Sequence, residues 1–190
     1  SSKGQGSGIA IATSMFDKKT AILTAGHLCE KSIDGLPPEI AIISNLVVIP
    51  RVSIMNYEGK FFTAEIKMID STNDTCIIFA DTKITPVRLG SKPHNGDRVY
   101  NEAAPMDISF ANTVPIFEGF YSGDITNSSG LTQSLYTIPG HPGSSGSPIL
   151  DGQGNLIGIV TQVIAQFPQI TTGPEFSEVQ RAVKWGRKNL

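Results

Sequence analysis

The sequence predicts an all-β protein with a single helix at its C-terminus. Short runs of apolar and β-branched residues recur along the 190-residue chain, and turn residues interrupt them at close intervals, which is typical of antiparallel sheets. The clearest turns lie at 57–60, 95–97 and 151–155; each contains Gly, and the last two also contain Asn and Asp. Two small barrels in tandem are the architecture that we expect, because closing a sheet removes its exposed edges.

The apolar runs predict each strand in turn. They place strands at 7–13, 20–24, 40–43, 47–55, 61–69, 76–80, 98–100, 113–121, 131–138, 147–151 and 156–164. The last of these has apolar residues on both faces, so we expect it to be buried on each side. The segment 82–92 has few apolar residues, and we expect it to link two halves of the chain.

The segment after Gly173-Pro174 changes to a helical spacing. Its apolar residues repeat every three or four positions and form one stripe: Phe176, Val179, Ala182, Val183 and Gly186. This spacing predicts a helix over 176–188. Ser177 and Gln180 fit a capping box at its start.

The composition excludes several classes of protein. Basic residues number 15 against 17 acidic ones, so the net charge is −2 and we expect no nucleic-acid partner. The apolar runs are too short to cross a bilayer, so we expect no membrane partner. Cys29 and Cys76 are the two cysteines, and the chain has no Cys/His cluster of the kind that binds zinc. We therefore expect no metal and no other cofactor, and we interpret the cysteines as free buried thiols.

Three segments carry candidate chemistry, and the strongest is 143–148, Gly-Ser-Ser-Gly-Ser-Pro. A serine hydroxyl is a weak nucleophile unless a neighbouring base accepts its proton. Flanking glycines allow a tight turn in which two N–H groups point at one oxyanion. We assign Ser145 as the nucleophile and the Gly143 and Ser145 N–H groups as the oxyanion donors. Ser144 and Ser147 are the rival hydroxyls, and an ordinary Gly/Ser turn is the alternative without chemistry.

The other two segments supply a base and a carboxylate. His27 closes the apolar segment 21–27, and the unperturbed histidine pKa of roughly 6.5 suits a general base near neutral pH. Asp74 precedes a strongly apolar strand, where a partly buried carboxylate needs a partner such as a histidine N–H. Asp70 and Asp81 are its rivals. The alternatives without chemistry are a structural histidine at a strand end and an aspartate that caps a turn.

The order His27, Asp74, Ser145 resembles that of the trypsin-like, chymotrypsin-fold serine proteases, whereas other triad folds follow other orders. The pattern is closest to the protease core of the bacterial Deg/HtrA type. Gly-Ser-Gly at 6–8 resembles the segment that leads into the first strand of that core, and 21–27 resembles the strand that bears the base. The aspartates at 70 and 74 resemble the pair of aspartates that precedes an apolar strand there. The Gly-x-Ser-Gly-Ser-Pro motif around Ser145 is also similar to that of several viral proteases.

The resemblance implies a fold and a domain organisation. The fold would be two tandem antiparallel six-stranded Greek-key β-barrels with a C-terminal α-helix, and the active site would lie in the cleft between the barrels. Residues 1–84 would form the barrel that carries His27 and Asp74, and residues 85–190 the barrel that carries Ser145 and the helix. Because no peptide-binding domain follows Leu190 in this sequence, we expect a protease core.

The resemblance also implies an activity, that of a serine endopeptidase that cleaves a protein or peptide substrate through an acyl-enzyme on Ser145. Two short segments would wall the primary specificity pocket: Pro139, Gly140 and His141 on one side, and Thr161, Gln162 and Val163 on the other. Pro139 falls where a carboxylate would select Lys or Arg, so we expect a small or apolar substrate residue. The alternative is a catalytically silent or conditionally active protein of this fold that acts as a binding module.

The resemblance bears on the cysteines and on the setting in which the protein works. Cys29 and Cys76 each follow a proposed triad residue by two positions, so a single disulfide stays open as the alternative to free thiols. An exported bacterial or virus-associated protein is favoured over a cytosolic one. A monomer is the default oligomeric state.

Overall fold

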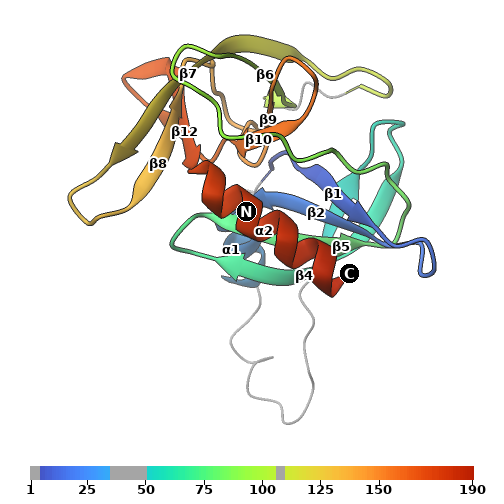
Figure 1. Ribbon diagram of the computed structural model, residues 1–190. Helices are drawn as coiled ribbons and strands as arrows, with labels where there is room; N and C mark the ends of the chain where they lie inside the picture. The colour runs from blue at the N-terminus through green and yellow to red at the C-terminus, as the bar shows by residue number, and fades with distance from the viewer. Residues whose placement is uncertain (1–4, 35–50, 106–109) are drawn as a thin grey trace.

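The computed structural model describes residues 5–34, 51–105 and 110–190, which form two antiparallel sheets and two helices (Figure 1). The first sheet has the strand order β1-β2-β5-β4-β3. Its strands are β1 (Ile9–Thr13), β2 (Thr20–Ala25), β3 (Arg51–Met55), β4 (Phe61–Asp70) and β5 (Thr75–Ala80). Two of its three interior strands, β2 and β5, are buried along their whole length.

The second sheet has the strand order β10-β9-β6-β7-β8-β12-β11. Its strands are β6 (Arg98–Glu102), β7 (Ile116–Thr126), β8 (Thr132–Tyr136), β9 (Pro148–Leu150), β10 (Leu156–Ile159), β11 (Gln162–Ile164) and β12 (Phe167–Pro174). The two edge strands, β10 and β11, are consecutive in the chain and separated only by Val160 and Thr161. The sheet must therefore curl until its edges approach each other.

The prediction of a mostly antiparallel β protein with a C-terminal helix is confirmed, whereas the structure describes the two expected six-stranded barrels as two open sheets. The sheets contain five and seven strands, and within the described residues no strand pairing closes either of them. The single strand expected at 156–164 is two strands. It breaks because Val160 bonds the segment that precedes β9, whereas Thr161 donates its N–H to Thr172 of β12. The predicted strand at 40–43 and the start of that at 47–55 lie outside the described residues.

Two elements were not predicted from the sequence. The helix α1 (Gly26–Asp34) directly follows β2, and its nine residues are too few to show a clear apolar stripe. Its first turn is capped by Asp74, whose Oδ1 accepts the His27 N–H at 2.7 Å. Strand β12 was also missed, because it has prolines near both ends. Its last four residues pair with β8 and thereby join the C-terminal part of the chain to the second sheet.

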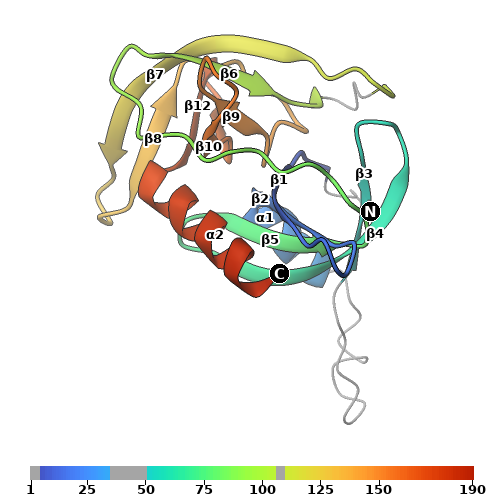
Figure 2. The same ribbon diagram turned by 45° about the vertical axis from the view of Figure 1, so that its right-hand side comes forward.

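The C-terminal helix α2 (Phe176–Asn189) confirms the prediction for 176–188, and the expected stripe faces the protein interior. Val179 and Val183 pack with Ile11 and Leu23 of the first sheet and Leu156 of the second, so the helix covers the junction of the two sheets (Figure 2). The predicted capping box is wrong. The N-cap residue is Glu175 and not Ser177, and it makes no side-chain cap bond. None of the helices in the described part of the chain could span a membrane.

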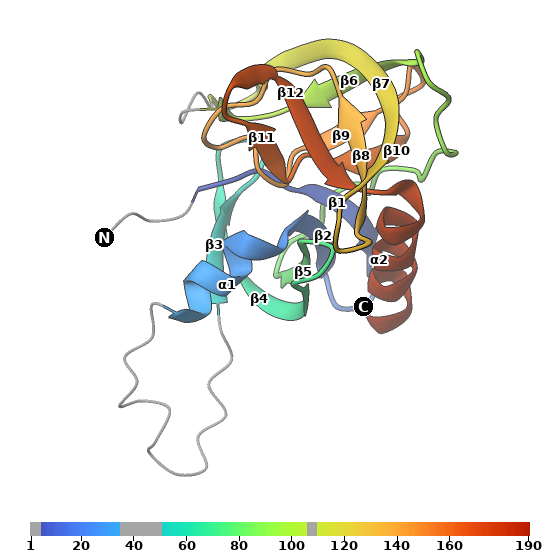
Figure 3. The ribbon, with the colours of Figure 1, turned by 90° about the vertical axis from the view of Figure 1, so that its left-hand side faces the viewer.

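The first sheet is covered on both faces, which explains why its central strands are buried throughout. Helix α1 and helix α2 lie on opposite sides of it (Figure 3). On the α1 side, Cys29 packs with Ile22 and Ile78. On the α2 side, Val179 packs with Leu23 and belongs to a different core cluster. His27, in the first turn of α1, consequently lies where this helix joins a sheet that is packed on both faces.

Candidate active site

His27 and Asp74 form a hydrogen-bonded pair where β2 passes into α1. The Nδ1 atom of His27 lies 2.9 Å from Oδ2 and 3.1 Å from Oδ1 of Asp74. The exposed fractions of the two side chains are 31% and 20%, so the pair is partly sheltered and still reachable. With Nδ1 engaged by the carboxylate, Nε2 is the ring nitrogen left to exchange a proton with a substrate group.

A glycine allows this close approach. Gly26 donates its N–H to the carbonyl oxygen of Asp74 at 2.9 Å. A Cβ atom on Gly26 would lie 3.0 Å from the nitrogen of Thr75 and 3.1 Å from Oδ1 of Asp74, which is tighter than ordinary van der Waals contact. Asp74 itself has a φ of 53°, a left-handed conformation that is uncommon outside glycine. The small residues before His27 therefore make room for the aspartate.

The two rival aspartates lie elsewhere. Asp70 accepts hydrogen bonds from the backbone N–H groups of Thr72 and Asn73 and holds the turn. Burial alone would raise the pKa of Asp70, but the bonds from Asn73 and Thr72 outweigh it and lower the pKa below its ordinary value. Asp81 is 60% exposed and faces Lys19 at 3.9 Å. Of the three candidates, the structure brings Asp74 to His27.

Burial separates the three serines of the 143–148 segment. Ser144 and Ser147 are 1% and 0% exposed. The Ser144 Oγ accepts the His141 N–H at 3.2 Å, and the Ser147 Oγ accepts a hydrogen bond from Asn101 at 2.8 Å. Ser145 is partly exposed, and its Oγ has no hydrogen-bond partner among the residues that the structure describes. Ser145 is thus the hydroxyl available to a substrate.

The segment 143–148 packs against the end of β2, close to His27. Gly146 has a φ of 81°, and a Cβ atom there would lie 2.2 Å from Thr24 Oγ1 and 2.9 Å from the Ala25 nitrogen. Only glycine permits this contact. The structure therefore gathers the three predicted triad residues around one end of β2. The Ser145 hydroxyl is not hydrogen-bonded to His27, and such bonds are often long before a substrate binds.

The two predicted oxyanion donors are free. Gly143 has a φ of 97°, and its carbonyl oxygen accepts a hydrogen bond from the Ser7 hydroxyl at 3.0 Å. Within residues 5–34, 51–105 and 110–190, neither the Gly143 N–H nor the Ser145 N–H has a hydrogen-bond acceptor. Two unpaired N–H groups in one turn can bind an oxygen that gains negative charge.

The predicted walls of the specificity pocket lie together. A Cβ atom on Gly140 would lie 2.5 Å from a methyl group of Val163 and 2.6 Å from the methyl group of Thr171. Gly140 also donates its N–H to the Pro168 carbonyl at 2.8 Å. Thr171 was not singled out from the sequence. Thr171 lies at the wall because β12, the strand that carries it, pairs with β11. Since β12 was not predicted, no local pattern pointed to Thr171.

The other predicted wall residues differ in accessibility. His141 and Gln162 are exposed, Pro139 is partly buried, and Thr161 is 3% exposed. Thr161 is therefore a structural member of the wall, bonded to β12 through its N–H. The contact between the two walls is made by Gly140 and Val163.

Cys29 and Cys76 form a disulfide, so the interpretation of free thiols is wrong. Their Cα atoms are 6.5 Å apart, and both residues are buried. Cys76 lies in β5 opposite Thr24, and helix α1, which was not predicted, turns Cys29 back toward it. The bridge connects the element that carries His27 to the strand that follows Asp74.

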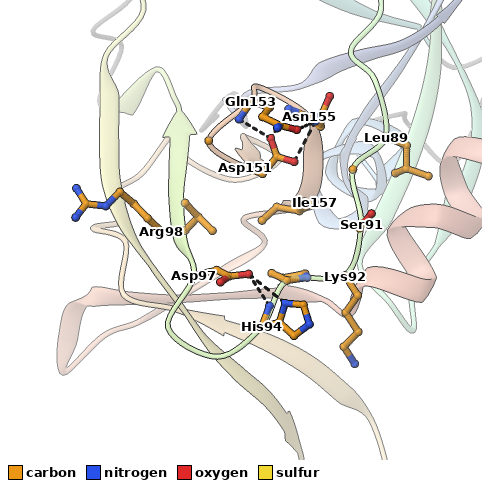
Figure 4. Close-up of a pocket in the computed structure, with 14 residues that line it drawn as sticks. Leu89, Ser91, Lys92, His94, Asp97, Arg98, Asp151, Gln153, Asn155 and Ile157 are labelled. Atoms are coloured by element: carbon orange, nitrogen blue, oxygen red, sulfur yellow. Dashed lines mark hydrogen bonds and ion pairs between the residues drawn. The ribbon is translucent and has the colours of Figure 1, made fainter.

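A surface hollow of about 500 Å³ lies away from these residues, between the segment 89–99 and the turn 151–157 (Figure 4). Its lining includes neither the predicted triad nor the specificity walls. The charged side chains there have protein partners: Asp151 accepts the Gln153 and Asn155 N–H groups, and Asp97 accepts that of His94. We therefore assign no chemistry to this hollow.

Residues 6–159 match the trypsin-like peptidase domain. Protease Do-like 8, a chloroplastic protein of Arabidopsis thaliana, is 27% identical over 167 residues, which cover 82% of this chain and 34% of that protein. The chain thus spans about a third of the length of this relative.

Two solved structures have the same fold. The serine endoprotease from Yersinia pestis superimposes with a TM-score of 0.68 at 19% identity, covering 97% of this chain and 58% of that one. The HtrA-type protease AlgW with a decapeptide gives a TM-score of 0.69 at 18% identity, covering 97% and 52%. The resemblance to HtrA/Deg-type proteases is confirmed by sequence and by structure. With more than half of its residues matched by the family, the chain belongs to the trypsin-like peptidase domains.

Proposed function

We propose that the protein is a serine endopeptidase that hydrolyses peptide bonds through an acyl-enzyme on Ser145. The observation that carries the proposal is the His27–Asp74 pair, with Nδ1 2.9 Å from the carboxylate, beside the loop that exposes Ser145. A hydroxyl, a base and a group that orients the base are the three parts that nucleophilic acyl transfer requires.

The proposed reaction has two matched halves. The Ser145 Oγ attacks the substrate carbonyl carbon while His27 Nε2 takes the hydroxyl proton, and the resulting oxyanion accepts hydrogen bonds from the Gly143 and Ser145 N–H groups. His27 then gives the proton to the leaving amine as the C–N bond breaks. Water repeats the sequence on the ester, and its proton passes through His27 back to Ser145. Asp74 holds the ring in the tautomer that leaves Nε2 free.

We also propose that the pocket beside Ser145 accepts a small apolar side chain. Val163 and Thr171 both contact the position of Gly140, which narrows the space between the two walls. The walls described contribute no carboxylate, so a Lys or Arg side chain would enter without a counter-charge. Replacing Val163 by glycine should widen the pocket and move the preference from Ala and Val toward Leu and Phe. An unchanged preference in a peptide-library cleavage assay would contradict this assignment.

The substrate class is a protein or peptide, as the family and the decapeptide named with AlgW suggest. The buried disulfide favours an oxidising setting outside the cytosol, because bridges of this kind are rare where thiols are kept reduced. The proposal also divides the chain into two halves, residues 1–84 with His27 and Asp74 and residues 85–190 with Ser145.

The first test is labelling with a fluorophosphonate, followed by intact-mass measurement. We expect one adduct on the native protein and none on Ser145→Ala. Ser147→Ala is a matched control, since its hydroxyl is 0% exposed, and it should label like the native protein once folding is verified. An adduct that survives Ser145→Ala would refute the choice of nucleophile. A folded native protein that does not label would favour the binding-module alternative.

A further inference from the structure

A serine just before β1 is bonded through every polar group it has. The Ser7 N–H donates to the Ser145 carbonyl at 2.8 Å, and the Ser7 carbonyl accepts the Thr24 hydroxyl at 2.7 Å. The Ser7 hydroxyl accepts the Ala104 N–H at 3.2 Å and donates to the Gly143 carbonyl at 3.0 Å. A serine at the start of a strand ordinarily caps its own turn, but these partners lie 17 to 138 positions away in the chain.

The pattern of these bonds matters for the nucleophile loop. Ser7 holds the carbonyl groups of Gly143 and Ser145, the two residues whose N–H groups are the proposed oxyanion donors. The peptide unit between Ser144 and Ser145 therefore lies between two anchored carbonyls, which restricts the conformations that the loop can adopt around its N–H. Glycine at 143 and 146, both with positive φ, would otherwise leave the loop free to rotate.

We propose that Ser7 is a positioning residue that holds the loop 143–146 in the conformation that binds an oxyanion. Its hydroxyl links the Ala104 amide to the Gly143 carbonyl, and its backbone fastens Ser145 to the end of β2. The proposal rests on the peptidase function proposed above and adds a residue that touches no substrate.

The neighbouring glycines allow the backbone around Ser7 to lie against the backbone of the loop 143–146. A Cβ atom on Gly6 would lie 2.8 Å from the Ser145 carbonyl oxygen, and one on Gly146 would lie 2.2 Å from the Ser7 carbonyl oxygen. The two backbones are thus in direct contact on both sides of Ser7. Its hydroxyl is then the group whose removal changes the bonding of the loop without changing this contact.

The test replaces Ser7 by alanine, which leaves the Gly143 carbonyl and the Ala104 N–H without this partner. The control is Ser14→Ala, because the Ser14 hydroxyl accepts only the Asp17 N–H, at 3.3 Å, in the exposed turn between β1 and β2. Fluorophosphonate inactivation separates binding from chemistry through KI and kinact. We expect kinact of Ser7→Ala to fall about tenfold, the effect of one hydrogen bond in the transition state. We expect KI to stay within about twofold and Ser14→Ala to match the native protein.

Hydrogen exchange by mass spectrometry provides a readout that does not need activity. Peptides that cover 139–147 should exchange faster in Ser7→Ala, whereas those from β4 and α2 should not change. A raised KI with an unchanged kinact, or unchanged exchange in 139–147, would overturn the proposal. If the native protein does not label at all, the peptidase proposal fails, and the exchange result still decides whether Ser7 holds the loop.

Discussion

The disulfide makes a quantitative prediction about stability. Cys29 and Cys76 are 47 residues apart in sequence, so the bridge closes a long loop in the unfolded chain. The loss of chain entropy follows about 2.1 + 1.5R ln n cal/mol/K, which for this loop is about 14 cal/mol/K, or about 4 kcal/mol at 25 °C. We expect the bridge to stabilise the folded protein by that amount, less any strain that it introduces.

The assay is urea unfolding of the native protein with and without a reductant. With m roughly 2 kcal/mol/M, the expected difference shifts the unfolding midpoint by about 2 M. The double variant Cys29→Ala/Cys76→Ala is the control, because its midpoint should not depend on the reductant. The comparison separates the cross-link from the packing of the two side chains, since the reduced native protein keeps both sulfur atoms.

The same reasoning predicts little effect on the site in the folded state. The bonds from Gly26 and His27 to Asp74 do not involve either cysteine, so we expect them to persist when the bridge is absent. Fluorophosphonate labelling of the folded double variant should therefore stay within a few-fold of native. A midpoint shift below about 0.5 M would refute the entropic account. Loss of labelling in a folded double variant would show that the bridge itself aligns the pair.

Three further predictions concern other parts of the fold. Gly146→Ala should destabilise the protein by about 1–3 kcal/mol more than Gly154→Ala, which is the usual cost of overpacking. Both glycines have positive φ, so the cost of that conformation cancels, but only Gly146 faces backbone atoms within 3 Å. Equal losses by thermal unfolding would contradict this. Burial alone would raise the pKa of Asp124, but hydrogen bonds from Lys92 and two hydroxyl groups lower it. The Asp124 carboxylate therefore stabilises the fold above about pH 4, and this effect is lost as the pH falls through the lowered pKa of the folded state. The free energy of unfolding of the native protein should thus fall relative to that of Asp124→Asn between about pH 5 and 2. A difference between the two proteins that does not change with pH would refute the assignment. Tyr136→Phe should leave the free energy of unfolding unchanged or raise it by up to about 1 kcal/mol, because the buried Tyr136 hydroxyl has no hydrogen-bond partner in the described part of the chain. A loss of stability above about 1 kcal/mol would show that this hydroxyl has a partner.

Much of the second sheet illustrates where local patterns are insufficient. The apolar run at 156–159 predicts a strand buried on both faces, and β10 is there. Nothing in that run shows that the chain leaves β9 after Ile159 and joins β12 at Gln162. Strand β12 carries prolines that argue against a strand, yet it pairs on both sides because the curled sheet leaves a place between β8 and β11. Pairing with β8 and β11 therefore stabilises β12 as a strand, although its own residues do not favour one.

Local patterns in the sequence were sufficient to predict the β class, the C-terminal helix and the three residue types of the candidate triad. Strand alternation and a helical stripe act over a few residues, and the motifs around His27 and Ser145 are short enough to be read locally. Three other features required long-range contacts: Asp74 and not Asp70 lies beside His27, Ser144 is buried while Ser145 is partly exposed, and Cys29 is joined to Cys76. Each of these outcomes depends on burial and on partners tens of residues away, and such long-range contacts leave no trace in a local pattern.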